Sequence, residues 1–204
     1  KNPLAMKCAF GENPKRCYGQ GAKRSPMTRM GTAALLRETL FKAKRYLEDK
    51  ENDKNPGFDM KLEAMIPVMK GEIPLKAHAH RADDILTSIR IAKEFGVKLT
   101  LDHCTDGALI ADELAEEGLS AFVGPTLGSK SKIELRNKSF TTPGVLTKAG
   151  VKVSIITDAP VIPLQYLPMC AGLAVNAGLP AEEAWKAITI NPAQSTGIGD
   201  RVGS

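Results

Sequence analysis

Residues 74–103 read PLKAHAHRADDILTSIRIAKEFGVKLTLDH and predict one strand–helix–strand unit. The apolar runs at 74–78 and 97–101 are typical of buried strands. Between them, Asp83 opens a segment whose apolar residues recur at helical spacing, and Gly96 is placed to end it. A strand, a helix and a second strand in this order indicate a parallel β/α unit.

The same alternation continues on both sides of this unit. Further strands are expected at 4–10, 119–123 and 151–156, and helices at about 28–47, after Asp106, at 143–149 and from Pro180 onward. The pattern indicates an α/β fold, namely a partial (β/α)8 TIM barrel with about strands 4–8 and their helices. An open doubly wound sheet is the structural alternative.

The chain is shorter than a complete barrel requires. An eight-stranded barrel takes about 250 residues, whereas this sequence has 204 residues and about five predicted strands. We therefore expect residues 1–204 to be the C-terminal portion of a barrel, with N-terminal strands outside them. The polar, turn-rich segment 11–19 follows the first strand, so we expect it to form a loop over the mouth of the site.

Charge and composition argue against several classes of function. The net charge is +5, but aromatic residues make up only 5%, so stacking platforms for nucleic acid are not expected. No run approaches the ~20 apolar residues that span a bilayer, and a signal peptide is not expected from the residues after Lys1, which lack an apolar run of the right length. The cysteines have no zinc-site or disulfide spacing, which favours reduced thiols in a cytoplasmic protein, with Cys104 buried rather than reactive.

Two histidines accompany the ends of successive predicted strands. His78 ends one strand and His103 lies just after the next, and the active sites of barrels form at these strand ends. Adjacent parallel strands would hold the two imidazoles side by side, and imidazole nitrogen suits zinc and similar divalent ions. Two ordinary, partly exposed histidines are the alternative. The matched placement on neighbouring strands favours metal ligands.

Asp158 and Lys7 are candidates for the same site. Asp158 follows the apolar run 151–156 at the same barrel end, where it can ligate a metal and accept a proton from a bound water. A turn residue before Pro160 is the alternative. Lys7 lies between apolar residues, and a lysine facing a barrel interior needs a negative partner or a change of chemistry. Carbamylation would make it a carboxylate bridging two metals; an outward-facing lysine, or one paired with Asp158, is the alternative.

Neighbouring polar residues are candidates for contacts with the substrate. His80 is two residues beyond His78 and would share its face if the strand continues. Arg81 could take a carboxylate of the substrate, and Tyr18 is a candidate from the segment 11–19. A surface-loop position is the alternative for His80.

Four motifs in this order resemble the amidohydrolase superfamily. Residues 76–81 (KAHAHR), 101–103 (LDH) and 156–160 (ITDAP) are similar to its fifth, sixth and eighth strand motifs, and 189–193 (TINPA) is similar to the segment after the eighth strand. The order and spacing match across residues 4–204. The branch that looks closest comprises imidazolonepropionase and the prolidase-like metal-dependent dipeptidases.

The resemblance implies a TIM barrel with one or two divalent ions, commonly zinc. It implies that His78 and His103 lie at the metal site and that Asp158 is a ligand and general base. Lys7 falls at the carboxylated lysine of binuclear members, whereas in mononuclear, imidazolonepropionase-like members the position of His103 serves the substrate or the hydrolytic water. The His-x-His pair of the family's first strand is absent, which favours a fragment without the N-terminal strands and the small flanking β domain.

The resemblance therefore implies a metal-dependent hydrolase with Asp158 and His103 as catalytic residues. It would cleave an amide or cyclic amide C–N bond in a dipeptide, an N-acyl amino acid or an imidazolone-like substrate through a metal-activated water. The chain alone is expected to be inactive. A deaminase on the same scaffold and a non-catalytic barrel fragment are the alternatives. The expected partner is a small-molecule substrate, with neither nucleic acid nor membrane, and a homo-oligomer stays open.

Overall fold

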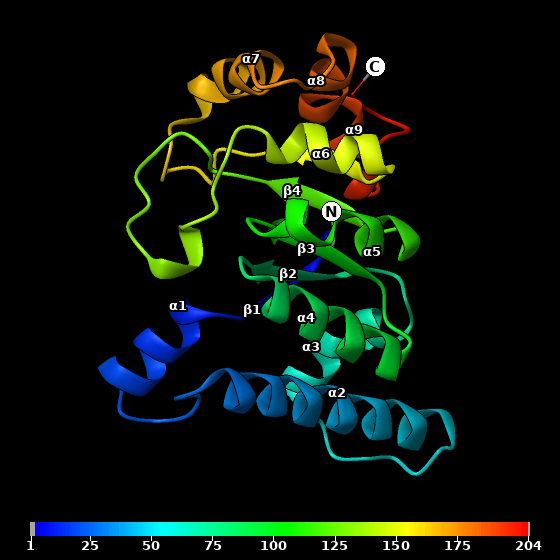
Figure 1. Cartoon of the computed structure of the whole chain (residues 1–204). Coiled ribbons are helices and arrows are strands. Elements are labelled where there is room, and N and C mark those ends of the chain that lie inside the picture. Colours follow the sequence, from blue (N-terminus) through cyan, green and yellow to red (C-terminus); the bar gives the residue numbers. More distant parts are fainter. Residues whose placement is uncertain (1–2, 204) are drawn as a thin grey trace. The chain divides into compact units, whose positions relative to one another are not determined.

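The computed structural model describes residues 3–203 and contains a five-stranded sheet in the order β1-β2-β3-β4-β5 (Figure 1). The strands are β1 (Met6–Ala9), β2 (Leu75–Ala79), β3 (Leu99–His103), β4 (Ser120–Val123) and β5 (Lys152–Ile155). The α-helices are α1 (Glu12–Pro14), α2 (Arg29–Glu51), α3 (Met60–Met69), α4 (Ala82–Phe95), α5 (Ala111–Glu116), α6 (Thr142–Ala149), α7 (Leu167–Asn176), α8 (Ala181–Ile188) and α9 (Ile190–Ser195). The other helical turns are η1 (Lys15–Gly21), η2 (Gly107–Ile110), η3 (Ile133–Leu135) and η4 (Leu164–Tyr166).

All the expected strands are present, and each begins one or two residues later than predicted. Sequence neighbours are also sheet neighbours, and helices lie in the connections between them. This parallel arrangement confirms the α/β fold class expected of part of a (β/α)8 barrel. β2 extends one residue past His78, to Ala79, and β3 ends at His103 itself.

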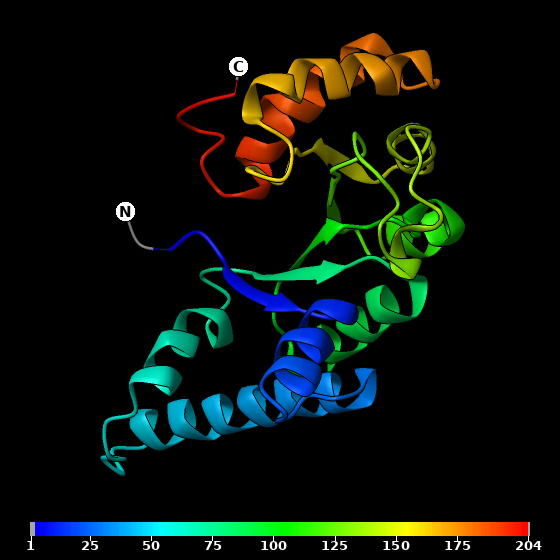
Figure 2. The ribbon, with the colours of Figure 1, turned by 90° about the vertical axis from the view of Figure 1, so that its left-hand side faces the viewer.

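One compact unit combines the chain up to Ala77 with Leu86–Leu99. Its longest helix, α2, begins after Thr28, whose side chain caps the first turn. α2 packs against α3 (Figure 2). The two helices are joined by Glu63, which accepts a hydrogen bond from the Tyr46 hydroxyl at 2.6 Å. This contact between α2 and α3 therefore stabilises the connection between β1 and β2.

The second unit comprises residues 78–85 and the chain from Thr100 onward. In it β3, β4 and β5 are parallel, and their register places His103 beside Val123 and Val123 beside Ile155. α7 and α8 lie next to each other and pack on β5 (Figure 1). Their contact is built from buried and mostly small side chains around Ile155, namely Cys170, Ala171, Ala174, Leu179, Ala184 and Ala187. The carboxyl ends of the three strands therefore meet at one edge of the sheet.

The segment 11–19 differs from the expected loop, because it is helical. α1 follows Gly11 directly, and the π-helix η1 continues to Gly21. Glycines lower helix propensity, which is why the sequence indicates a loop. The wider turn of η1 carries the chain through these glycines, as the bond from Ala22 N to Cys17 O at 3.1 Å shows.

Across the described residues, helices that combine the length and apolarity of a bilayer span are absent.

Candidate metal centre

Three histidines converge in the second unit. The ring centroids of His78 and His103 are 4.3 Å apart, those of His80 and His103 are 4.6 Å apart, and those of His78 and His80 are 4.9 Å apart. One ring nitrogen of each lies within 4.8 Å of the others. His78 and His80 share a face because strand side chains alternate with a period of two. The structure thus brings together two of the four predicted ligands, His78 and His103, and adds His80 to them.

The turn after β3 holds His103 in a strained conformation. His103 and Cys104 have φ angles of 73° and 48°, in the left-handed region that residues other than glycine rarely adopt. Two backbone bonds tie this turn to the end of β2: Cys104 N donates to Ala79 O at 3.0 Å, and Asp106 N donates to His80 O at 2.8 Å. Such strain, about 1–3 kcal/mol per residue, persists where the surroundings enforce it and clusters at functional sites.

The carboxylate of Asp106 anchors the segment that follows His80. A helical turn follows Asp106 as expected, but the Asp106 side chain makes no capping bond at the start of η2. Instead it accepts hydrogen bonds from Ala82 N at 3.1 Å and from Asn137 Nδ2 at 2.8 Å. An anionic side chain at the first backbone N–H of α4 also complements the helix dipole. Asp106 therefore fixes where α4 begins, two residues after His80.

His103 is oriented by a backbone carbonyl at the end of β4. Its Nδ1 lies 2.6 Å from Gly124 O. A carbonyl oxygen can only accept, so Nδ1 carries the proton and Nε2 keeps its lone pair for another partner. Gly124 has φ 138°, and a Cβ there would lie 2.1 Å from Ile156 O. Only glycine therefore fits the position that supplies this carbonyl.

His80 is held neutral by its surroundings. Burial is the largest cause that lowers its pKa, and together with the neighbouring His103 and His78 it brings the value from 6.5 to about 2. Its Nδ1 lies 2.8 Å from the Thr105 hydroxyl, which can serve as donor or acceptor. At neutral pH the ring is therefore an uncharged imidazole, the protonation state that ligates metal ions.

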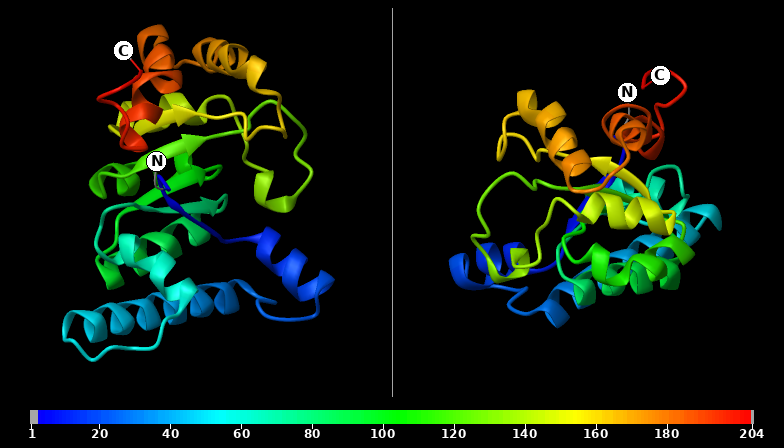
Figure 3. Two further views of the ribbon diagram at one scale, coloured as in Figure 1. Left: turned by 180° about the vertical axis from the view of Figure 1, so that it is seen from behind. Right: turned by 45° about the horizontal axis from the view of Figure 1, so that its top comes forward.

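A buried carboxylate lies near the other ring nitrogen of His80, Nε2, on the long β4–α6 loop (residues 124–141). Figure 3 shows this loop as the segment that leaves β4 and returns to α6. Glu134 is 1% exposed, and its Oε1 is 4.0 Å from His80 Nε2 and 3.8 Å from Lys132 Nζ. Sequence reasoning missed Glu134, Lys132, Thr105 and Gly124. Gly124 was detectable as a glycine directly after a strand, whereas Glu134 is one acid in a lysine-rich loop.

Asp158 lies outside the three-histidine group. It is exposed, in a turn after β5, with φ 52°, and its carbonyl accepts a hydrogen bond from Val161 N at 2.9 Å. β5 ends at the same edge as β3, because Ile155 and His103 are both in register with Val123. The position is therefore at the expected strand end, and its role as ligand and base stays a prediction.

The other candidate residues are placed as follows. Lys7 lies in β1 and is exposed. Tyr18 lies in η1 and is 44% exposed, with the Arg24 guanidinium 5.2 Å from the centre of its ring. Arg81 donates to the carboxylate of Asp83 at 2.9 and 2.8 Å. The metal-bridging role of Lys7 and the substrate contacts of Tyr18 and Arg81 stay predictions.

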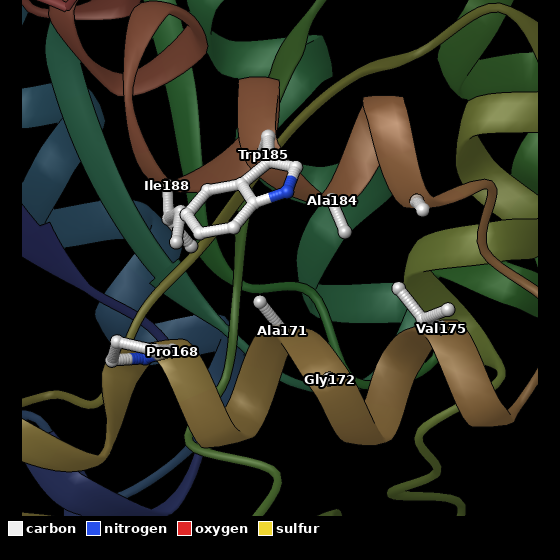
Figure 4. Close-up of a pocket in the computed structure, with 8 residues that line it drawn as sticks. Pro168, Ala171, Gly172, Val175, Ala184, Trp185 and Ile188 are labelled. Carbon is white, nitrogen blue, oxygen red and sulfur yellow. The ribbon is translucent and has the colours of Figure 1, made fainter.

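Two further features of the second unit are the buried thiol of Cys104 and a pocket between α7 and α8. Cys104 is buried, and burial raises the pKa of its thiol to about 12, so it behaves as an apolar residue, as expected. An apolar pocket of about 140 Å³ lies between α7 and α8. Figure 4 shows Trp185 of α8 facing Pro168 and Ala171 of α7 across it. The side chains that line this pocket include no titratable group.

Comparison with known proteins identifies relatives of the chain. The sequence profile of the amidohydrolase family matches residues 63–204. The curated protein "Amidohydrolase tasK" of Hapsidospora irregularis is 24% identical over 97% of this chain and 22% of its own length. The chain therefore spans less than a quarter of that relative.

Solved structures contain the same fold. An amidohydrolase from Thermotoga maritima MSB8 superposes with a TM-score of 0.96 at 43% identity, over 100% of this chain and 54% of its own. A Xaa-Pro dipeptidase with bound methionine in its active site has a TM-score of 0.52 at 22% identity, over 74% of this chain and 41% of its own. The latter shows likeness of fold alone. The chain thus spans about half of the solved amidohydrolase that it resembles.

Proposed function

The chain belongs to the amidohydrolase family, and we therefore propose that the full-length protein is a metal-dependent hydrolase of amide or cyclic amide C–N bonds. A dipeptide, an N-acyl amino acid or an imidazolone-like ring is the proposed substrate class. The observation that carries the proposal is the convergence of His78, His80 and His103, whose ligand atoms lie within 4.8 Å of one another. Together with the family, this donor set supports hydrolysis rather than binding alone.

The donor set fits a divalent metal ion, and zinc is the ion we propose. Buried imidazoles side by side are disfavoured as cations, and His80 is neutral because its pKa is lowered to about 2. The Nε2 lone pair of His103 is available because Nδ1 is bonded to Gly124 O. Neutral imidazole nitrogens are the ligands that zinc prefers. When bound, such an ion polarises a carbonyl oxygen and lowers the pKa of a water molecule.

The residues of this chain then have distinct tasks. His78 and His103 would hold the ion, with His80 or Asp158 beside them. Asp158 would accept the proton of the attacking water and pass it to the leaving nitrogen, the task of a general base that becomes a general acid. Its place at the end of β5 supports this role. Lys7, if carbamylated, would hold a second ion, and we propose the one-ion and two-ion sites as alternatives.

Metal analysis combined with a substrate panel tests the proposal. Full-length protein is assayed against dipeptides, N-acyl amino acids and cyclic amides, with and without a chelator, and its zinc content is measured. We expect chelator-sensitive hydrolysis and at least one ion per chain. The His103→Asn variant should lose both, whereas Arg201→Gln, an exposed position, should retain both. Turnover that survives complete removal of metal contradicts the proposal.

A deaminase on the same scaffold is the second candidate. It is favoured by one observation, the carboxylate of Glu134 at 4.0 Å from His80 Nε2, because deamination needs an acid that delivers a proton to the leaving nitrogen. Ammonia released from an amino-substituted heterocycle identifies this reaction. Release of a free amine or ring-opened acid from the hydrolysis panel identifies the first.

A further inference from the structure

The β4–α6 loop brings an excess of positive charge to the edge of the sheet that carries the histidines. It contains four cations, Lys130, Lys132, Arg136 and Lys138, against the single carboxylate of Glu134. Lys132 and Lys138 both lie close enough to disfavour the protonated form of His80 and so contribute to its lowered pKa. A site of neutral imidazoles beside such a loop has a field that favours an anion.

Two of these cations brace the loop itself. Lys138 Nζ donates to Gly128 O at 2.7 Å and to Ser129 O at 3.0 Å. Lys130 Nζ donates to Arg136 O at 2.8 Å. Their ammonium groups satisfy backbone carbonyls on the same loop, as expected for residues that shape a long connection. These two lysines therefore have a structural task.

Lys132 is placed differently, because it is tied to the histidines through Glu134. One carboxylate oxygen, Glu134 Oε1, is 3.8 Å from Lys132 Nζ and 4.0 Å from His80 Nε2. The side chain of Glu134 is completely buried, whereas that of Lys132 is 23% exposed. A buried carboxylate requires a nearby positive charge. Glu134 thus holds the ammonium of Lys132 next to His80 while part of the lysine stays open to solvent.

Lys132 and Arg81 each have a carboxylate partner, but it is the partner of Lys132 that also lies beside a histidine of the group, at 4.0 Å from His80 Nε2. The side chain of Lys132 is 23% exposed, and its ammonium is a compact charge whose donors can turn toward an anion. Arg81, the cation expected to receive a substrate carboxylate, directs two of its donors to Asp83, at 2.9 and 2.8 Å. The link through Glu134 to His80 is therefore what distinguishes Lys132 from Arg81.

We propose that Lys132, positioned by Glu134 beside His80, is the specificity-determining cation that binds a carboxylate of the substrate. The inference rests on the proposed function and narrows it to amides that bear a free carboxylate, such as N-acyl amino acids and dipeptides. Lys132 touches the substrate in this account, and Glu134 is a positioning residue that acts through it.

Matched pairs of ligands test the role of Lys132 in the full-length protein. N-Acetylglycine, N-acetylleucine and N-acetylproline are each compared with the corresponding carboxamide. Binding to metal-free protein is measured by calorimetry, and kcat/KM is measured on zinc-loaded protein. The parent should prefer the acid by about 10- to 100-fold, the usual effect of one charge-assisted hydrogen bond. Lys132→Met should bring acid and carboxamide to within about threefold, mainly through KM for the acid.

Two further variants separate a specific contact from a general field. Arg136→Met removes the same charge from an exposed position on the loop and should keep the preference. Lys132→Arg retains the charge and should still prefer the acid over the carboxamide. The inference is overturned if the parent shows no acid preference, if Lys132→Met leaves it unchanged, or if Arg136→Met abolishes it equally. If the protein binds the acids more tightly through Lys132 but hydrolyses none of them, only the proposed function is contradicted. If it shows chelator-sensitive hydrolysis but does not prefer the acids, only this inference is contradicted.

Discussion

At the scale of single residues, Gly124 is the position where the histidine site depends most directly on backbone geometry. Gly124→Ala should destabilise the fold by about 3 kcal/mol or more, because φ 138° disfavours alanine and the new Cβ would lie 2.1 Å from Ile156 O. Displacing the carbonyl that orients His103 should also weaken zinc binding. Urea unfolding and zinc titration measure the two effects.

Gly150→Ala provides the matched control. Gly150 also has a positive φ, 98°, but a Cβ added there would meet none of the described atoms within 4 Å. The substitution should cost about 1 kcal/mol and leave zinc affinity at the parent value. Equal losses at both positions would show that the close approach of Gly124 to Ile156 has no consequence of its own.

His80 predicts an acid-sensitive fold in the metal-free protein. Its pKa is lowered to about 2 in the folded state, against about 6.5 in an unfolded chain. Between these values the unfolded state binds the proton and the folded state does not, so stability falls as pH drops below about 6.5, by up to about 1.4 kcal/mol per pH unit. Urea unfolding from pH 7 to 4 checks this, and His80→Gln should have a shallower slope.

Asp158 carries the prediction about catalysis. In the full-length enzyme, Asp158→Asn should lower kcat by about 10²–10⁴-fold, because asparagine keeps the shape but cannot accept a proton. The fold should be unaffected, since the side chain is exposed. A variant as fast as the parent, measured on a substrate that the parent hydrolyses, excludes Asp158 as the base.

At the scale of elements, α3 depends on its first turn. The side chain of Asp59 accepts hydrogen bonds from Lys61 N at 2.8 Å and Leu62 N at 3.1 Å. Asp59→Ala should cost about 1 kcal/mol, whereas Asp59→Asn retains the acceptor and should stay close to the parent. Thermal unfolding of the two variants provides the comparison, and similar melting temperatures for Asp59→Ala and the parent would contradict the capping role.

The strands and α2 could be predicted because local patterns determine them. β-branched and apolar runs between turn residues define each strand, and Thr28 signals the start of α2. α7 could not be predicted in this way. Its sequence contains Pro168 and Gly172, which are weak helix formers. Packing of Ala171 and its neighbours around Ile155 of β5 stabilises that helix instead, and such long-range contact leaves no local signal.

The same distinction applies to the site. The proximity of His78 and His103 follows from the rule that parallel strands end at one edge, and the two-residue period brings in His80. The path of a long loop follows from neither rule. Glu134 and Lys132 lie on such a loop, so their approach to His80 emerges only from the folded chain.

At the scale of the whole molecule, the open edges of the sheet carry a prediction. β1 and β5 are the outer strands of a parallel sheet, and unpaired strand edges promote association between chains. We propose that residues 1–204 form the C-terminal portion of a barrel. The 204-residue chain alone should associate progressively with concentration in light scattering, while the full-length protein forms one discrete species. A monodisperse, zinc-saturated isolated chain would contradict this proposal.

The β4–α6 loop has a consequence for protein engineering. Its first residue, Gly124, orients His103, while Lys132 and Glu134 lie several residues further along. Replacing the whole loop to change substrate preference would therefore also remove the carbonyl on which the ligand geometry depends. A graft that crosses over after Thr126, and returns before Asn137 so that its bond to Asp106 survives, would separate the two. Directed evolution of new substrate ranges should accordingly accumulate changes within 127–136 and spare the residues that flank them.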